Sequence, residues 1–257
     1  MNASVIQLDG VEKRYASGLL ALRDMALRVG AGEFVSLLGP SGCGKSTVLR
    51  LVAGLEGASA GRIEAPALGR SDVHSGAADT AFVFQEPTLM PWASVFDNVW
   101  LPLRLAGVAR AAAAASVHAS LRAVDLDEFA TAFPAELSGG MKMRTSIARA
   151  LVTRPRVLLM DEPFAALDEI TRQKLNGDLL DAWQAQGLAT LFVTHSVFEA
   201  VFLSQRVLVM GARPGRVMAE LPIDEPYPRG GEFRTSARFA QSCRQLSRAL
   251  EQAPLAS

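Results

Sequence analysis

Short apolar runs alternate with longer mixed segments along most of the chain. Patterns typical of β-strands occur at residues 4–9, 22–29, 33–38, 80–84, 156–160, 189–194 and 206–210. The first alternates apolar and polar side chains, whereas a run such as 157–160 is continuously apolar, as expected for a parallel strand buried on both faces. Residues 62–75 show neither pattern and are predicted to be irregular. Because helical stretches separate the later strands, an α/β fold with a mainly parallel sheet is favoured.

Helical spacing of apolar residues marks three other regions. Residues 45–54 suit a buried helix, and residues 94–154 read as helical throughout, so we expect a helical insertion in the α/β core. Near the C-terminus, residues 232–251 place apolar side chains at helical spacing beside four arginines. A basic amphipathic helix of this kind can lie on a membrane or pack on its own domain or a partner, and we favour packing.

Composition excludes several classes of protein. Hydrophobic residues make up 49% and charged residues 20% of the chain, as in an ordinary globular domain. With 26 basic and 26 acidic residues, no net field attracts nucleic acid, and two cysteines are too few for a disulfide framework. No signal peptide and no run near the ~20 apolar residues of a membrane span is recognised. We expect a soluble chain that needs a separate partner for any membrane role.

A phosphate-binding loop is predicted between the strand at 33–38 and the helix at 45–54. Its sequence is Gly39-Pro40-Ser41-Gly42-Cys43-Gly44-Lys45-Ser46. Glycines let backbone N–H groups surround phosphate oxygens, and the helix start adds its positive dipole end. Lys45 can reach the β and γ phosphates, and the Ser46 hydroxyl suits Mg²⁺. Cys43 is either a reactive thiol, activated by Lys45 and the helix start, or a small apolar residue, and we favour the second.

Two further segments suit phosphate chemistry. The apolar strand at 157–160 ends in Asp161 and Glu162, which can hold Mg²⁺ and polarise an attacking water. Ser138 is a good N-cap for a predicted helix at 141–152, and Gly139 and Gly140 expose N–H donors at its start. A second anion site is therefore predicted far along the chain from the first.

Together these motifs resemble the nucleotide-binding subunit of ABC transporters, over about residues 5–217. The matching segments are the Walker A loop (39–46), Gln85 of the Q-loop, the signature (137–141), Walker B (157–162), the D-loop (165–168) and the switch His195, with Tyr15 at the aromatic position against adenine. This resemblance implies a P-loop NTPase core with a mainly parallel sheet, an N-terminal antiparallel β-subdomain and an inserted α-helical subdomain. The implied boundaries are 1–87 and 154–230 for the core, 88–153 for the helical subdomain and 231–257 for a helical tail.

The resemblance also implies roles for individual residues. Glu162 would act as general base and His195 would contact the γ-phosphate. The residues implied to bind ATP are Tyr15, Gly39, Pro40, Ser41, Gly42, Cys43, Gly44, Lys45, Ser46, Thr47, Gln85, Ser138, Gly139, Gly140 and Asp168. Ser46, Gln85 and Asp161 would hold Mg²⁺. Two copies would bind head to tail, each ATP lying between the phosphate loop of one and the Ser138 turn of the other, with Asp168 coupling the sites.

The segments 85–99 and 212–217 are similar to ATPases of importers for nitrate, sulfonates, taurine and pyrimidine precursors of thiamine. This similarity implies transmembrane permease subunits docked near 85–99, a substrate-binding protein acting indirectly, no nucleic acid partner, and a peripheral location on the cytoplasmic face of the inner membrane. Trp92 would anchor the permease or fill the core of the insertion. Met143 stands where the family has Gln and Ala165 where Ser is common, yet we expect hydrolysis to be retained.

Two other functions stay open at this point. A non-transport ABC ATPase acting on DNA or ribosomes would share the motifs, but tandem domains, long coiled coils and basic patches are not visible in the sequence. A phosphate-loop kinase for a small molecule would explain residues 39–46 but neither the Ser138 turn nor His195. His74 and His118 match no motif and are predicted to be surface residues.

Overall fold

The larger of two sheets forms the centre of the molecule in the computed structural model, which describes residues 4–68 and 79–253. Its order is β5-β6-β7-β3-β8-β9. The strands are β3 (Phe34–Leu38), β5 (Thr80–Val83), β6 (Val157–Asp161), β7 (Ala189–Thr194), β8 (Arg206–Gly211) and β9 (Arg216–Pro222). All neighbours pair in parallel except β8 and β9. Every residue of β3, β6 and β7 is buried, which explains why these strands are mostly apolar.

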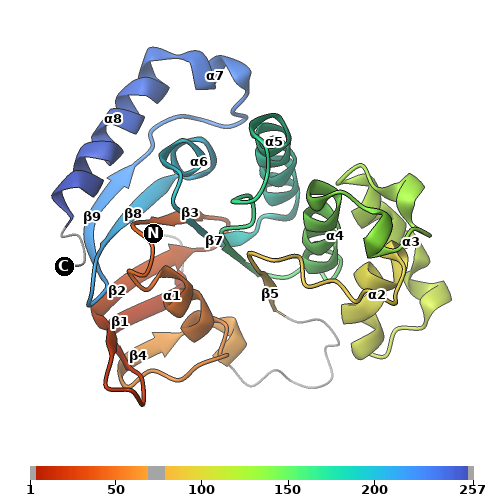
Figure 1. Ribbon diagram of the computed structural model, residues 1–257, viewed down its shortest axis with the longest axis horizontal. Coiled ribbons are helices and arrows are strands. Elements are labelled where there is room, and N and C mark those ends of the chain that lie inside the picture. The colour runs from red at the N-terminus through yellow and green to blue at the C-terminus, as the bar shows by residue number, and fades with distance from the viewer. Residues whose placement is uncertain (1–3, 69–78, 254–257) are drawn as a thin grey trace.

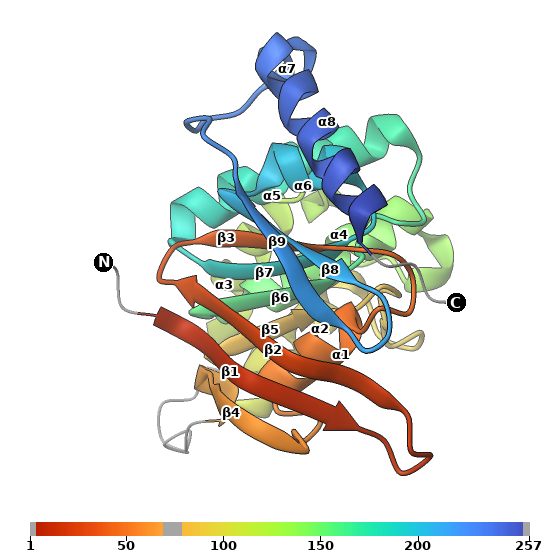
Figure 2. The same ribbon diagram turned by 90° about the vertical axis from the view of Figure 1, so that its left-hand side faces the viewer.

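A smaller antiparallel sheet covers one side of this core (Figure 2). Its order is β2-β1-β4, from β1 (Ser4–Arg14), β2 (Leu20–Gly30) and β4 (Ala60–Glu64). Helix α1 (Lys45–Val52) packs between the two sheets, and their apolar side chains form one buried cluster. The phosphate loop therefore leaves β3 into a helix fixed from both sides.

The remaining helices lie on the opposite face and beyond the edge strand β5 (Figure 1). The helices on the opposite face of the larger sheet are α5 (Glu169–Gln186), α6 (Val197–Leu203), α7 (Gly231–Thr235) and α8 (Ala237–Gln252). A separate helical subdomain contains α2 (Val95–Leu105), α3 (Arg110–Arg122) and α4 (Gly139–Leu151). Short 3₁₀ turns occur at Pro66–Leu68, Asp127–Phe129 and Pro134–Glu136. The predicted fold class, an α/β core with an antiparallel β-subdomain and a helical insertion, is confirmed.

Several predicted elements need correction. Residues 62–64 belong to β4, so the irregular segment predicted at 62–75 is wrong there, and 69–75 lie outside the described residues. Strand β9 was not predicted, and β1 continues five residues beyond its predicted end at Asp9, to Arg14. The predicted tail helix is broken at Ser236, whose hydroxyl accepts a hydrogen bond from the Phe239 N–H and caps α8.

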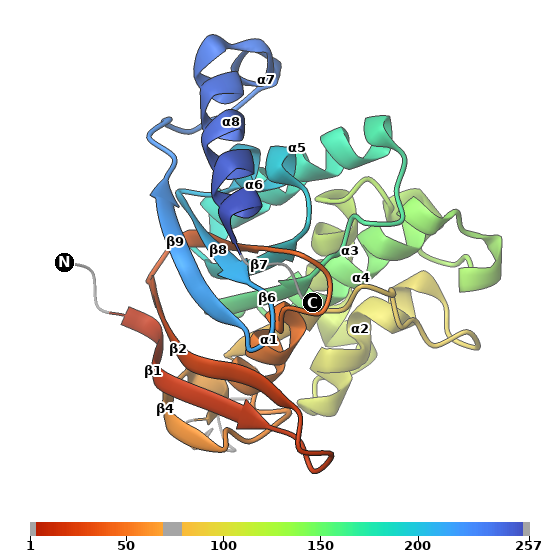
Figure 3. The same cartoon turned by 60° about the vertical axis from the view of Figure 1, so that its left-hand side comes forward.

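The tail packs on its own domain, as favoured from the sequence (Figure 3). Phe239, Cys243 and Leu246 of α8 are buried in the main apolar cluster, beside α6 and β8. Arg229, 6% exposed, leads into this tail and donates hydrogen bonds to backbone carbonyls after α6 and β9. Within the described part of the chain, no helix combines the length and apolarity that crossing a bilayer requires.

Candidate functional site

The phosphate loop is shaped by backbone conformations that favour glycine. Gly42 and Gly44 have φ angles of +75° and +98°, in the left-handed region. Lys45, 4% exposed, donates hydrogen bonds to the carbonyls of Gly39 and Pro40 at 2.9 and 3.0 Å. Its ammonium also lies 3.6 Å from Glu162. The loop thus holds a buried cation at the start of α1, where the helix dipole adds positive potential.

Two carboxylates at the end of β6 meet this loop. The Ser46 hydroxyl donates to Asp161 Oδ1 at 2.9 Å. Burial raises the pKa of Asp161, although the Ser46 hydrogen bond opposes the shift. Glu162 has a φ angle of +45°, a strained conformation for a residue with a side chain, and its N–H donates to the Val193 carbonyl on β7. This conformation directs the Glu162 carboxylate into the space beside Lys45.

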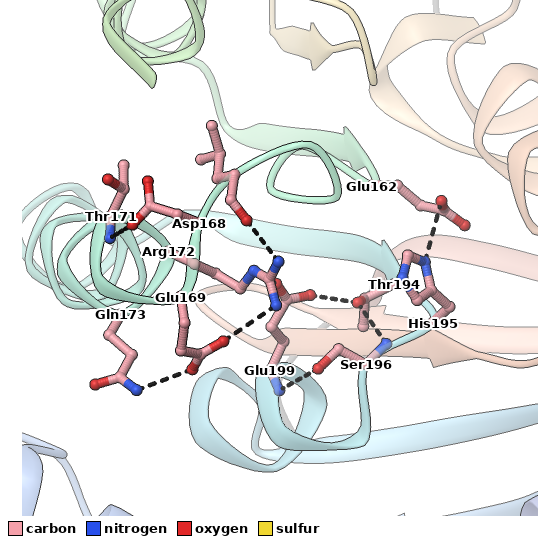
Figure 4. Close-up of polar contacts among 11 residues, drawn as sticks. Glu162, Asp168, Glu169, Thr171, Arg172, Gln173, Thr194, His195, Ser196 and Glu199 are labelled. Atoms are coloured by element: carbon pink, nitrogen blue, oxygen red, sulfur yellow. Dashed lines mark hydrogen bonds and ion pairs between the residues drawn. The ribbon is translucent and has the colours of Figure 1, made fainter. Parts of the chain in front are cut away.

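His195 approaches the same carboxylate from the end of β7 (Figure 4). Its Nδ1 lies 3.3 Å from Glu162 Oε2, and its side chain is 56% exposed. The neighbouring Thr194 hydroxyl accepts from the Ser196 N–H and donates to Glu199 of α6. These contacts fix the backbone on both sides of His195 and leave its ring accessible.

Asp168 belongs to a second part of the same polar network (Figure 4). It caps α5 by accepting from the Thr171 N–H at 3.0 Å, a hydrogen bond that holds the pKa of Asp168 below its usual range. Arg172, one turn later, donates to the Leu167 carbonyl at 2.7 Å, and its Nε lies 3.6 Å from buried Glu199. The segments carrying Asp168 and His195 are therefore linked through Arg172 and Glu199, which the sequence motifs did not reveal.

A cavity of about 380 Å³ gathers the predicted nucleotide residues. Its lining includes Tyr15, Ser41, Gly42, Gly44, Lys45, Ser46, Thr47, Gln85 and Glu162. The Tyr15 and Thr47 hydroxyls lie 3.3 Å apart, so Tyr15 borders the start of α1. Hydroxyl, carboxylate and amide oxygens at Ser46, Asp161 and Gln85 are donors that Mg²⁺ prefers, and Ser46 already contacts Asp161. Arg213 also lines the cavity and was missed from the sequence.

Cys43 is a structural thiol. It is 1% exposed within the loop, and burial raises its pKa despite the opposing charge of Lys45. The favoured interpretation of Cys43 as a small apolar residue therefore agrees with the structure, and the reactive alternative does not.

The Ser138 turn lies away from the cavity, on the helical subdomain. Ser138 caps α4 by accepting from the Met141 N–H at 3.3 Å, and Ser138 and Gly139 are exposed. As far as residues 4–68 and 79–253 define it, the cavity lining includes neither this turn nor Asp168. Met143 is buried in the subdomain at 3% exposure, where its thioether packs in the apolar core. The two segments predicted to bind anions, the phosphate loop and the Ser138 turn, are therefore separate surfaces of a single chain.

The segment after Gln85 lies between the core and α4. Trp92 is 77% exposed, so it does not fill the core of the insertion. Arg149 of α4 donates to the carbonyls of Pro87 and Thr88, both at 2.9 Å, and this attaches the segment to the helix that Ser138 begins. His118, predicted as a surface residue, is half-buried and contacts Asp127 at 2.6 Å, while His74 lies outside the described residues.

Known proteins share both the sequence and this architecture. The taurine import ATP-binding protein TauB of Rhizobium johnstonii is 49% identical over 233 residues, covering 89% of this chain and 88% of the relative. The aliphatic sulfonates import ATP-binding protein SsuB 1 of Pseudomonas savastanoi pv. phaseolicola is 44% identical, covering 93% and 95%. A dimeric ATP-binding cassette, MJ0796, solved in a post-hydrolysis state with ADP and Pi, superimposes with a TM-score of 0.74 at 31% identity, covering 86% of this chain and all of that one.

The family match agrees with the geometry. Residues 22–165 match the ABC transporter family, a range that runs from β2 through the phosphate loop and α4 to just beyond the carboxylates at the end of β6. The relatives extend the similarity over about nine-tenths of the chain. This chain therefore belongs to the ABC transporter family of ATP-binding proteins.

Proposed function

We propose that this chain is the ATP-hydrolysing motor subunit of an ABC importer. The observation that supports this most directly is the cavity at the phosphate loop, which Lys45, Gln85 and Glu162 line together. Its polar lining and buried lysine suit a nucleotide polyphosphate. The separate Ser138 turn gives the chain a second surface for the same kind of ligand.

In the proposed reaction, Glu162 orients and deprotonates the water that attacks the γ-phosphate. Its carboxylate is held between Lys45 at 3.6 Å and His195 at 3.3 Å, so its position is fixed before the reaction begins. Lys45 and the N–H groups of the loop stabilise charge on the phosphate oxygens, and His195 contacts the γ-phosphate. When bound by Ser46, Gln85 and Asp161, Mg²⁺ supplies further charge neutralisation.

The complete site is proposed to need a second copy of the chain. Ser138, Gly139 and Gly140 lie at the start of α4, where helix N–H donors are free, but they do not line the cavity of their own phosphate loop. Head-to-tail pairing brings this turn onto the partner's nucleotide, and Asp168 lies at the junction between the sites. The dimeric state of the similar cassette MJ0796 supports the pairing of two copies.

The importer class is proposed from the relatives. Taurine and aliphatic sulfonates, for which two of these relatives are named, share a sulfonate group, and a nitrate import protein is 42% identical. We propose a small anion of this kind as cargo, with pyrimidine precursors as the alternative retained from the sequence. Residues 85–99, with exposed Trp92, would receive a permease subunit at the cytoplasmic face of the membrane, and a substrate-binding protein would act indirectly. We propose that the chain divides into an ATP-binding core made of residues 1–87 and 154–230, a helical subdomain at 88–153 and a helical tail at 231–257.

The decisive experiment is Mg²⁺-dependent ATP hydrolysis by the purified chain and by Glu162→Gln. We expect turnover by the wild type, and an inactive variant that ATP traps as a dimer on gel filtration. Glu169→Gln is the matched control, because Glu169 lies on α5 with a side chain 63% exposed and outside the cavity lining. Phosphate transfer to an added small-molecule acceptor instead of water would favour a kinase, and unaltered hydrolysis by Glu162→Gln would refute its role as base.

A further inference from the structure

The turn between β8 and β9 is packed directly against the phosphate loop. The Gly215 N–H donates to the Ala21 carbonyl at 2.8 Å, and the Arg23 N–H donates to the Gly215 carbonyl at 3.1 Å. A Cβ atom at Gly215 would overlap the carbonyl oxygen of Cys43, so only glycine allows this approach. At the other end of the turn, a Cβ on Gly39 would lie 2.7 Å from the Met210 carbonyl. The turn is therefore held in place by backbone contacts with both β2 and the loop.

Arg213 projects from this fixed turn onto the loop. Its Nη2 lies 3.3 Å from the position that a Cβ atom on Gly42 would occupy, so the guanidinium rests against the middle of the phosphate loop. Arg213 is exposed and lines the cavity together with Tyr15 and Gln85. With the residues at 4–68 and 79–253 it forms no ion pair and no side-chain hydrogen bond. The donors of Arg213 are thus available to a ligand in the cavity.

The charges that line the cavity show what kind of ligand suits Arg213. Lys45 is buried and shares its ammonium among two carbonyls and Glu162. Arg213 is the other cation in the described lining, and its side chain is exposed. A guanidinium presents its N–H groups in a planar fork that matches two oxygens of one phosphate group. A polyphosphate extending along the loop past Gly42 would meet this fork.

We propose that Arg213 binds a phosphate group of the nucleotide in this cavity, adding a cationic contact from outside the phosphate loop. This inference rests on the proposed ATP-binding function. Charge-assisted hydrogen bonds of this type are expected to change affinity about tenfold or more.

The test is direct nucleotide binding by the full chain. Isothermal titration calorimetry would measure the binding of AMP, ADP and ATP, in the presence of a chelator that removes metal ions, to wild type, Arg213→Gln, Arg213→Lys and Arg216→Gln. Arg216 is the matched control, because it is an exposed arginine at the start of β9 that contacts Met218 and does not line the cavity. We expect Kd for ADP and ATP to rise about tenfold in Arg213→Gln and less in Arg213→Lys, with Arg216→Gln unchanged. Weaker binding of AMP by Arg213→Gln as well would place the contact at the α-phosphate.

Two outcomes would overturn the inference. The first is a wild-type Kd in Arg213→Gln for both nucleotides; if adding Arg213→Gln to Glu162→Gln also abolishes the ATP-trapped dimer, Arg213 contacts the second copy instead. The second is an equal rise of Kd in Arg216→Gln, which would indicate a general effect of positive charge. If wild type itself binds neither nucleotide, the proposed function fails, and this result is distinct from both.

Discussion

Replacing Arg229 with Met should destabilise the whole chain, although Arg229 is remote from the cavity. Its side chain is 6% exposed and makes hydrogen bonds to five backbone carbonyls, those of Val201, Phe202, Ser204, Ile223 and Glu225. The carbonyls of Val201 and Phe202 belong to the last turn of α6, where the helix leaves them without a partner. Arg229 therefore serves as a C-terminal cap for α6 and joins it to the chain that enters the tail.

The expected cost follows from these contacts. Each buried carbonyl left without a donor costs about 1–3 kcal/mol, but neighbouring contributions do not add because the structure relaxes and water enters. Removing one side of a buried charged arrangement typically costs about 3–5 kcal/mol, which we take as the expected loss. At about 2–4 °C per kcal/mol, the melting temperature should fall by roughly 6–20 °C.

Urea unfolding of Arg229→Met, followed by tryptophan fluorescence and circular dichroism, measures this loss. Arg238→Met is the control: Arg238 contacts Glu225 and Asp224 from a side chain that is 65% exposed, so its removal should cost less than about 1 kcal/mol. A loss below about 1 kcal/mol for Arg229→Met as well would refute the capping argument.

Three other substitutions or reagents test separate features. Trp92→Ala removes an exposed side chain, 77% accessible, so we expect unchanged ATP hydrolysis by the isolated chain but at least tenfold slower transport in the reconstituted importer; full transport would contradict this. Burial raises the pKa of Cys43 and raises that of Cys243 to about 11, so iodoacetamide at pH 8 should label the folded chain at least tenfold more slowly than the unfolded one, and equally rapid labelling would count against burial. Burial also raises the pKa of Asp161 above its value in the unfolded chain, so the native state binds the proton more tightly. The free energy of unfolding therefore falls as the pH rises from the unfolded pKa through the folded pKa of Asp161. Without nucleotide, the melting temperature of Asp161→Asn should therefore be higher than that of wild type at pH 7 and equal to it at pH 4. A lower melting temperature for the variant at pH 7 would refute the argument that the buried Asp161 carboxylate destabilises the native state.

The parts of the fold that were predictable have strong local patterns. Residues 189–194 are mostly apolar, with threonine only at 190 and 194, and they form β7 with the predicted bounds, because a strand buried on both faces allows few polar positions. Strand β4 has four exposed residues among its five, and β9 contains Arg and Glu and ends in Pro. Neither has a strong pattern, because each lies at the edge of its sheet and is held by one neighbouring strand.

The site shows a similar limit. Glycine and lysine spacing at 39–46 predicts the phosphate loop because the chemistry is local. Arg213 lies against Gly42 although the two residues are far apart in the sequence, and no local sequence pattern predicts this contact. For Cys43, the neighbouring Lys45 and helix start suggested a lowered pKa, but burial of the thiol outweighs both. Burial depends on what packs over the loop, which neighbouring residues in the sequence do not reveal.

Arg149 has a mechanical consequence. Its bonds to the Pro87 and Thr88 carbonyls join the exposed Trp92 segment to α4, and α4 begins at Ser138. Arg149 lies in the last turn of α4 and Ser138 caps its first turn, so α4 connects the Trp92 segment directly to the Ser138 turn without involving the sheet. In the proposed importer, a permease subunit docked at Trp92 would therefore be connected to the Ser138 turn through a single helix.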